Sequence, residues 1–347
     1  MSKNLPRAAV LTALALAIAA CGAGAKSEKP VAIANTPTPS ATATTPAPTP
    51  KAVYPLTGLP VTSAARAARP AVSVKIDNIA QALPQSGLNQ ADIVTDILVE
   101  GGLTRLMATF QSQDVPLIGP IRSARPVDAD LTRELNGGIF AYSGAARGEI
   151  APSIDHSTAL LISNDHNPQW FWRTDRAAPH NVYSSTSRLY KAGAASHRKF
   201  KAPPQLFAYS TDAPTGRSVS RVRIPFSSYS TASWTWTGRN YVRTQNGSPD
   251  TLSNGSRINT TNVVILSVTW RPTNIIDAAG NRDPYVIVIG SGKAWVMRNG
   301  KLIEGRWTRP SYRVPVRLTD KTGQVISLDP GRTWIELQPR PFTPTFG

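Results

Sequence analysis

Apolar residues follow three different patterns along this chain of 347 residues. Residues 8–20 form one short unbroken apolar run, whereas residues 22–53 hold almost no large apolar side chain. From residue 54 onward, short apolar runs alternate with polar positions and are separated by turn residues. Alternation with a period of two is typical of half-buried strands. A chain of this length commonly forms about two domains, and we expect them at residues 54–205 and 206–347.

Two alternating apolar runs between residues 91 and 110 are separated by the pair Gly101-Gly102. A Gly-Gly pair between such runs predicts a two-residue hairpin turn. Because side chains two residues apart share a face of a strand, Asp96, Glu100 and Arg105 would then lie on one face. The expected cross-strand pairs are Glu100 with Leu103, Leu98 with Arg105, and Asp96 with Met107. A helix over residues 91–100 is the alternative, since runs this short fit either structure.

The remaining pattern predicts further strands and a few short helices. In the first half we expect a strand at residues 70–78, helices at 131–135 and 187–195, and a strand, a turn and a helix start within 137–149. In the second half we expect strands at residues 262–270, 285–292, 293–307 and 333–339. Asn299-Gly300 inside one of these stretches predicts a type I′ hairpin. The second half is therefore predicted to be mainly β, and the Pro-rich segment 199–216 connects it to the first.

The N-terminus has the features of a secretory signal. Lys3 and Arg7 introduce the apolar run, which is too short for a comfortable transmembrane span. The residues from Ile18 to Cys21 resemble a bacterial lipobox. That resemblance implies cleavage before Cys21 and a diacylglyceryl group on its sulfur, with further acyl chains such as palmitate. Cys21 is the only cysteine, so it has no internal disulfide partner, and lipidation accounts for it. An ordinary signal peptide with a stray cysteine is the alternative.

The segment that follows, residues 22–53, is rich in Pro, Thr and Ala. Such a composition cannot bury a core, and proline favours extended backbone. We interpret the segment as a stalk that holds the folded part off the membrane. Because two or more acyl chains anchor a protein firmly, we expect a protein that is lipid-anchored to the cell membrane on its extracytoplasmic face.

The chain is strongly basic, with a net charge of +17 from 38 Lys and Arg and 21 Asp and Glu. Residues 1–21 hold two basic and no acidic residues, so the chain after cleavage carries +15 (36 minus 21). A basic surface favours polyanionic partners. Export removes nucleic acid as the usual target and leaves anionic lipid headgroups, anionic wall polymers, wall precursors that bear phosphate, or an envelope protein. The alternative is that arginine is simply the preferred surface charge of this organism.

The stretch IGPIRSARPVDADL, residues 118–131, combines a turn with charged side chains. Its Gly-Pro pair predicts the turn. Arg122 and Arg125 then present planar forks that suit phosphate or carboxylate, and Ser123 adds a hydroxyl. Asp128 could orient the arginines, bind a metal or act as a base. We interpret the stretch as an anion-binding edge. The alternative is that each arginine pairs with a local aspartate and serves only the fold.

A second candidate region is the irregular polar and aromatic stretch 163–189, since long irregular stretches often carry function. It contributes Arg173, His180 and Asn181. His180 could act as a general acid or base near neutral pH, although a lone histidine is more often a structural residue. The four histidines lack the spacing of metal ligands, and we expect no metal. Nucleophile-elbow, phosphate-loop and dinucleotide fingerprints are absent from the sequence, and we expect no cofactor.

Several stretches, taken in order, resemble the YerB-like bacterial lipoproteins, which carry N- and C-terminal parts of a domain of unknown function, 3048. They are PLTGLP, RPAVSVKIDN, PQSGLNQADIV, VEGGLTRLMATFQS, IGPIRSARP, APHNVY, GSGKAWVMRNGKLIEGRWTRP and LDPGRTWIELQP. The resemblance covers residues 54–339 and implies an α+β fold, with a mixed α/β N-terminal domain followed by a β-rich C-terminal domain on a lipid anchor. The family has no established activity, so the resemblance implies no reaction. Residues 145–169 do not align with its motifs.

Chemistry and resemblance together give one predicted ligand site. Its residues are Glu100, Arg105, Arg122, Ser123, Arg125, Asp128, Arg173, His180 and Asn181, with Cys21 as the separate lipidation site. Our first hypothesis is a lipoprotein that binds an anionic envelope ligand or partner without catalysis. The alternative is an envelope transferase or hydrolase that acts on phosphate-linked wall precursors, with Asp128 or Glu100 as base. The sequence does not decide whether the protein is an enzyme.

Overall fold

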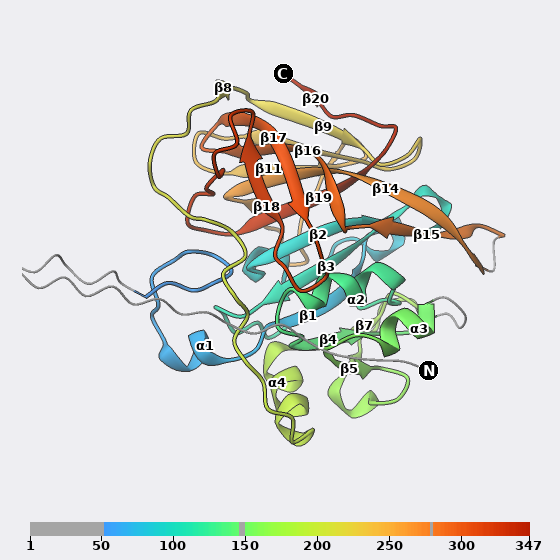
Figure 1. Ribbon diagram of the computed structural model, residues 1–347. Helices are drawn as coiled ribbons and strands as arrows, with labels where there is room; N and C mark the ends of the chain where they lie inside the picture. Colours follow the sequence, from blue (N-terminus) through green and yellow to red (C-terminus); the bar gives the residue numbers. More distant parts are fainter. Residues whose placement is uncertain (1–51, 146–149, 278–279) are drawn as a thin grey trace, which may run out of the picture. The chain divides into compact units, whose positions relative to one another are not determined.

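The computed structural model describes residues 52–145, 150–277 and 280–347 (Figure 1). The predicted signal peptide with Cys21, and the predicted stalk up to residue 51, lie outside the described residues. No helix in the described part is long and apolar enough to cross a membrane. The helices are short: α1 (Ala64–Ala68), α2 (Pro126–Arg133), α3 (Ile150–Asp155) and α4 (Thr186–Ala195). Strands make up most of the regular structure.

The main sheet takes strands from both halves of the chain. The first half supplies β1 (Val72–Asp77), β2 (Ile93–Leu98), β3 (Thr104–Phe110), β4 (Ile139–Tyr142) and β5 (Leu160–Ser163). The second half supplies β14 (Asn262–Ile276), β16 (Gly290–Arg298), β17 (Lys301–Arg309), β18 (Arg317–Asp320) and β19 (Thr333–Pro339). The order is β18-β17-β16-β14-β19-β2-β3-β1-β4-β5, with β15 (Arg282–Ile287) paired to β14 and β8 (Arg217–Ser218) paired to β17.

The two halves of the chain meet where β19 runs parallel to β2. Thr333 lies opposite Ile93 and Leu337 lies opposite Ile97. The predicted α+β class is confirmed: a mixed sheet with helices in the first half is followed by a β-rich second half. The boundaries 54–205 and 206–347 stay predictions, and one continuous sheet crosses between these two segments.

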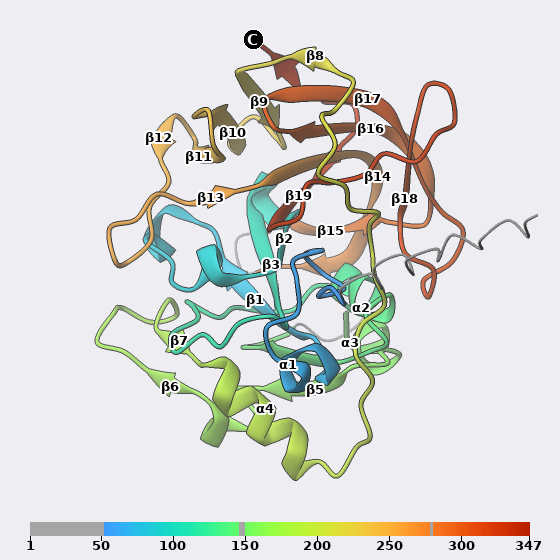
Figure 2. The ribbon, with the colours of Figure 1, turned by 90° about the vertical axis from the view of Figure 1, so that its left-hand side faces the viewer.

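A smaller sheet packs on one face of the main sheet (Figure 2). It contains β9 (Arg221–Pro225), β10 (Thr231–Trp236), β11 (Tyr241–Gln245), β12 (Ser248–Pro249), β13 (Asn259–Thr260) and β20 (Thr345–Phe346). Trp334 of β19 points toward it and meets Trp234 at a ring-centroid distance of 5.1 Å. The next residue, Ile335, points the other way and lines a cavity with Leu131 near the end of α2. The sheet is therefore covered on both faces. A two-stranded ribbon, β6 (Trp172–Arg173) with β7 (Val182–Tyr183), lies apart.

The hairpin of β2 and β3 exists, but the predicted register was wrong by one residue. Asp96 pairs with Leu106 and Ile97 pairs with Arg105. The turn holds three residues, Glu100–Gly102, rather than two, and the Val99 N–H closes it on the Leu103 carbonyl at 2.8 Å. A shift of one residue moves side chains to the opposite face. Asp96 and Arg105 therefore lie on opposite faces of the ribbon, and the alternative helix over 91–100 is excluded.

Other local predictions fared differently. The Asn299-Gly300 hairpin is confirmed, since both residues have positive φ (46° and 69°) and Arg298 pairs with Lys301 across the turn. The helix predicted at 187–195 is confirmed by α4. The helix predicted at 131–135 begins earlier, at Pro126, because proline suits the first helical turn. The Asp128 carboxylate also accepts the Arg125 N–H at 2.6 Å and so caps that turn.

A buried charge cluster holds the smaller sheet against the main sheet. Arg243 of β11 is fully buried and donates to Asp96 of β2 at 2.5 Å and to Asp250. Its guanidinium carbon also lies 5.0 Å from the ring centroid of Trp334. Removing one partner of such a buried pair leaves an uncompensated charge. The packing of the two sheets therefore depends on Arg243 and Asp96, which are 147 positions apart in the chain (243 minus 96).

Glu336 adds a third carboxyl group to this cluster. It lies beside Asp96 in the paired register of β19 and β2, and it accepts the Trp234 indole N–H at 2.6 Å. Burial, and then the neighbouring Asp96, raise the pKa of Glu336 to about 8 against the opposing effect of Arg243. Glu336 is therefore protonated in the folded protein at neutral pH, whereas an unfolded glutamate is ionised.

We predict that Glu336→Gln changes how stability depends on pH. Between about pH 4.5 and 8 the unfolded chain loses the Glu336 proton while the folded chain keeps it. The wild-type free energy of unfolding therefore falls as pH rises through this window. Glutamine carries no such proton, so the stability of the variant relative to wild type should rise steadily from pH 5 to pH 8. Urea unfolding at several pH values measures this difference.

The matched control for that experiment is Glu304→Gln. Glu304 is an exposed partner of Lys321 at 2.9 Å, and its pKa is lowered by the hydrogen bond from Lys321. Its protonation does not change above pH 5, so this variant should follow wild type across the window. A flat difference for Glu336→Gln would contradict the buried, protonated carboxyl group.

Candidate functional site

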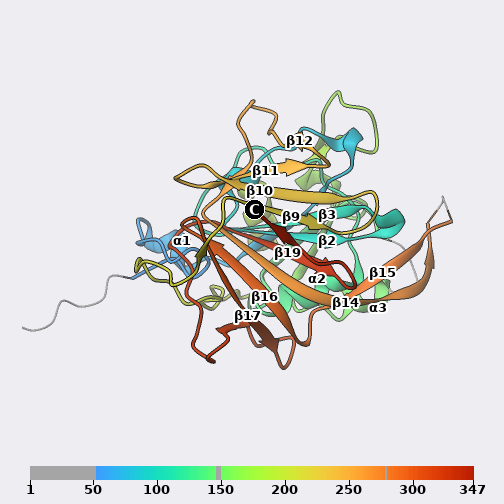
Figure 3. The same cartoon turned by 90° about the horizontal axis from the view of Figure 1, so that it is seen from above.

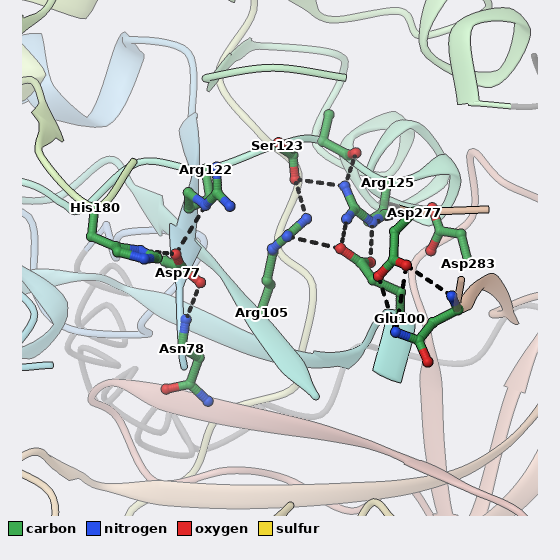
Figure 4. A network of polar contacts seen from close by, with 12 residues as sticks. Asp77, Asn78, Glu100, Arg105, Arg122, Ser123, Arg125, His180, Asp277 and Asp283 are labelled. Carbon is green, nitrogen blue, oxygen red and sulfur yellow. Dashed lines mark hydrogen bonds and ion pairs between the residues drawn. The ribbon is translucent and has the colours of Figure 1, made fainter. Parts of the chain in front are cut away.

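A row of charged side chains lies where β1 ends and β3 begins, beside the N-terminus of α2 (Figure 4). Asp77, the last residue of β1, is the direct cross-strand partner of Arg105 in β3. The segment before α2 crosses the same place, because the Arg122 N–H donates to the Lys75 carbonyl of β1 at 2.9 Å. This crossing brings Arg122 and Arg125 next to Arg105. Three arginines from two segments of the chain therefore converge on one end of two strands.

Asp77 organises one end of the row. One of its oxygens, Oδ2, accepts from Arg122 Nε at 3.0 Å and from His180 Nδ1 at 2.8 Å. The Asp77 carboxylate is 1% exposed, whereas the side chains of Arg122 and His180 are 23% and 11% exposed. A histidine that donates from Nδ1 keeps Nε2 for another partner. The Arg122 fork likewise keeps both of its Nη groups, since Nε alone contacts Asp77.

Glu100 organises the other end of the row. It sits in the three-residue turn, accepts from Arg105 at 2.9 Å, and accepts two hydrogen bonds from Arg125, one of them at 2.8 Å from Nε. Burial alone would raise the pKa of Glu100, but the two guanidinium groups lower it to about 2. Burial and the adjacent Arg125 lower the pKa of Arg105 to about 10. Glu100 thus neutralises two arginines in a largely buried position.

Asp283 of β15 brings a second carboxyl group to Arg125, with Oδ2 at 3.1 Å from Nε. Burial raises the pKa of Asp283 to about 6, because the attraction of Arg125 is offset by the nearby charge of Glu100. Asp283 is 3% exposed and belongs to the second half of the chain. The row therefore runs from His180 at one end to Asp283 at the other and includes both halves of the chain (Figure 4).

Asp128 serves the fold. One oxygen accepts the Arg125 N–H at the start of α2, and the other accepts from Lys75 Nζ at 2.7 Å. Both side chains of this ion pair are fully buried, and burial lowers the pKa of Lys75. The pair joins α2 to β1 directly under the row. It holds Arg125 at the helix N-terminus, where its fork reaches Glu100.

The remaining predicted residues take different positions. Ser123 belongs to the row, where its carbonyl accepts from Arg105 at 3.3 Å. Arg173 and Asn181 pair with each other at 2.7 Å on the β6–β7 ribbon. In the described residues neither of their side chains hydrogen-bonds to the row, although Asn181 adjoins His180 in the chain. The predicted set is therefore divided into the row and a neighbouring surface pair.

Three residues of the row were missed at the sequence level: Lys75, Asp77 and Asp283. Lys75 and Asp77 alternate with Val74 and Ile76 in β1, and two charges at alternate positions of an apolar strand are a usable signal. Every residue of β1 is buried, so these charges had to find partners. Asp283 carries no such signal, because it reaches the site only through the pairing of distant strands.

Cavities near the site are small. The most apolar one lies between α2 and the main sheet, with Leu131, Leu266 and Ile335 in its wall, and holds about 40 Å³. Pockets for small organic ligands are typically roughly 300–1,000 Å³. The described residues also contain no group of three or more His, Cys, Asp or Glu side chains placed to hold a metal ion. The site is thus a largely buried row of polar side chains, partly exposed at Arg122, rather than a deep pocket.

Comparison with known proteins gives consistent matches. Residues 56–201 match the domain described as "Protein of unknown function (DUF3048) N-terminal domain", and residues 222–335 match the DUF3048 C-terminal domain. The chain is 32% identical over 295 residues to a Bacillus subtilis (strain 168) protein named "Putative lipoprotein YerB", covering 82% of this chain and 86% of the relative. It also resembles the crystal structure of YerB protein from Bacillus subtilis, with a TM-score of 0.74 and 29% identity over 86% of this chain and 100% of the other.

We predict that Glu100→Gln destabilises the protein strongly at neutral pH. Loss of the carboxylate leaves Arg105 and Arg125 buried without their shared partner, and breaking a buried ion pair costs about 3–5 kcal/mol. Because the folded pKa of Glu100 is about 2, its stabilisation is present above about pH 4.5 and is lost as pH falls toward 2. The difference from wild type in urea unfolding should therefore shrink from pH 5 to pH 3.

Asp114→Asn is the matched control for Glu100→Gln. Asp114 also joins two arginines, Arg66 at 2.8 Å and Arg69, but its side chain is 52% exposed. Water screens such a pair, and its loss should cost about 0–1 kcal/mol. Equal losses for the two variants would show that burial does not strengthen the role of Glu100.

Proposed function

The chain belongs to the family of proteins of unknown function that carry the DUF3048 N- and C-terminal domains, and on that premise we propose that it is a lipid-anchored protein of the extracytoplasmic face that binds an anionic ligand of the cell envelope. Two observations support the anchor: the lipobox that ends at Cys21, and the similarity to a relative whose name describes a lipoprotein. The charge of +15 after cleavage at Cys21 supports an anionic ligand.

The observation that carries the ligand part of the proposal is the sharing of one buried Asp77 oxygen by Arg122 and His180. Asp77 holds both side chains by hydrogen bonds from the buried side of the site. Both Nη groups of Arg122 and the Nε2 of His180 are not used in these bonds. The Arg122 Nη groups suit the oxygens of a phosphate or carboxylate group, and His180 Nε2 donates to such an oxygen when the imidazole is protonated. Preorganised donors lose little conformational freedom on binding. We assign first contact with the anion to Arg122 and His180.

Arg105 and Arg125 have a different role in this proposal. Glu100 and Asp283 already neutralise them, and their side chains are largely buried. They shape the row and hold Ser123 through its carbonyl. Of the two arginines in the predicted anion-binding edge, the proposal therefore keeps only the more exposed one, Arg122, as a ligand contact. Arg173 with Asn181 would extend the contact to a longer polyanion.

A transferase or hydrolase acting on phosphate-linked wall precursors is the second candidate. The Asp77–His180 contact favours it, because a carboxylate on Nδ1 orients a histidine to take a proton at Nε2. The apolar cavity of about 40 Å³ argues against a site that encloses a long lipid tail. His180→Gln should abolish turnover of a phosphate-linked precursor and spare its binding if this candidate is right. Loss of binding alone would favour the non-catalytic protein.

We predict that anions raise the melting temperature of the full-length protein in detergent through Arg122. The panel holds inorganic phosphate, pyrophosphate, polyprenyl-phosphate analogues, glycerol-phosphate polymer fragments and muropeptides, each with and without Mg²⁺. A ligand at 100 times its dissociation constant stabilises by about 2.7 kcal/mol, or roughly 5 °C for a chain of this size. Arg122→Gln should remove the shift.

The control is Arg239→Gln, which removes one exposed positive charge in the loop between β10 and β11, away from the row. It separates a specific loss at Arg122 from a general loss of net charge. Arg122→Gln should melt below wild type without ligand, because buried Asp77 keeps only His180 as an ionic partner, so each shift is measured from the ligand-free melting temperature of the same variant. An anion shift that survives in Arg122→Gln, or the absence of any shift across the panel, would sink the assignment.

A further inference from the structure

Exposed apolar side chains gather around the arm formed by β14 and β15, which extends beyond the rest of the main sheet (Figures 1 and 3). Nine large apolar side chains are exposed in the described residues, and four of them lie here. These four are Leu103 (36% exposed), Tyr229 (75%), Trp270 (43%) and Ile276 (55%). Soluble surfaces commonly expose such residues singly, whereas a group of them marks an interaction site.

Contacts join these residues into one surface. The Tyr229 ring packs against Gly102 of the β2–β3 turn, where an added Cβ would lie 3.4 Å from the ring. A hollow of about 180 Å³ borders the turn, and its wall includes Trp270, Arg282, Arg340 and Phe342. The Trp270 indole N–H donates to the Arg340 carbonyl at 3.2 Å, which fixes the ring at the rim.

Positive charge accompanies the apolar side chains. Arg282 and Arg340 are both exposed, and Arg282 lies directly across the arm from Ile276. We call the set Leu103, Tyr229, Trp270, Ile276, Arg282 and Arg340 the arm patch. Tryptophan and tyrosine prefer the interface between lipid and water, and arginine reaches from apolar surface toward anionic headgroups. The composition of the arm patch therefore matches an anionic lipid surface.

A tether alone would leave the orientation of the protein on the membrane undefined. The 30 residues from 22 to 51 can span at most about 100 Å when fully extended. A protein held by such a segment could meet the membrane with any face. One face is selected only when it binds the lipid surface itself, and the arm patch has the side chains for that.

We propose that the arm patch docks the tethered protein on the anionic headgroup layer of its own membrane. The membrane tether rests on the proposed function above, whereas docking is a separate property of the patch. Asp283, the last carboxyl group of the polar row, follows Arg282 directly in β15. The Asp283 side chain points to the opposite face of the strand from Arg282, so docking through Arg282 would hold this end of the row near the headgroup layer without turning it toward the lipid.

The test uses the full-length protein reconstituted in vesicles that carry lipids brominated on the acyl chains. Bromine quenches tryptophan fluorescence only at close range. Vesicles of phosphatidylcholine alone are compared with vesicles that contain phosphatidylglycerol. We expect lipid-specific quenching in the anionic vesicles and loss of most of it in Trp270→Phe. Trp172→Phe is the matched control, because Trp172 is also partly exposed but lies on the β6–β7 ribbon against Arg188.

The charge of the patch has its own variant. Arg340→Gln keeps the backbone carbonyl that accepts from Trp270 and removes one cation. An arginine near an anionic surface contributes roughly fivefold to binding, so the docked fraction should fall by about that factor. Arg239→Gln should leave it unchanged.

Each outcome separates docking from the proposed function. Flotation with phosphatidylcholine vesicles supports the anchor, whether or not Trp270 is quenched. Flotation only with anionic vesicles, lost in Arg340→Gln, supports docking and contradicts the anchor. Flotation with anionic vesicles without quenching at Trp270, or equal quenching there in the Trp270→Phe and Trp172→Phe variants, overturns docking. Protection of Trp270 by a soluble wall glycan in place of lipid would also overturn it.

Discussion

The structure depends on the parallel pairing of β19 with β2. This pairing joins the two halves of the chain into one sheet and sets which residues face which layer. Trp334 and Glu336 point to the smaller sheet, and Ile335 and Leu337 point to the side of α2. A shift of one residue in this register would exchange the two sets and would place charged groups in the apolar layer. The contacts of Trp334 and Glu336 with Trp234 oppose such a shift, because they need β19 in the observed register.

The candidate site follows from the need of buried charged groups for partners. The end of β1 is buried, yet it carries Lys75 and Asp77, and each needs a partner. Asp128 forms an ion pair with Lys75, while Arg122 and His180 pair with Asp77. The arginines of the motif are thus first of all partners for buried carboxylates. The proposed anion binding therefore falls where pairing is incomplete and the side chain remains partly exposed, at Arg122 and His180. Charge density in the sequence alone is a poor guide to that place.

Much of the fold could be predicted from local pattern. Val72, Val74 and Ile76 indicated β1. Asn299-Gly300 indicated the hairpin turn between β16 and β17, because only a few residue types adopt positive φ at both positions. The Gly101-Gly102 turn was ambiguous in length, since glycine suits two-residue and three-residue turns alike. That single residue decided the face of Arg105. Asp283 could not be predicted, because it reaches Arg125 across 158 positions (283 minus 125) through strand pairing. The fully buried strands β2 and β3 also lack the alternation that reveals a face.

The place of β19 in the sheet has a consequence for the order of folding. β19 lies between β14 and β2, and its residues are among the last to be made. The β19 partner of Ile93 is Thr333, which comes 240 positions later in the chain (333 minus 93). Contacts of such long sequence separation form slowly. Until β19 arrives, β2 presents an unpaired edge, the kind of surface that pairs with other chains. A chain synthesised from its N-terminus therefore completes its central sheet only after residues 333–339 have been made. A truncation before residue 333 leaves both halves without their common strand.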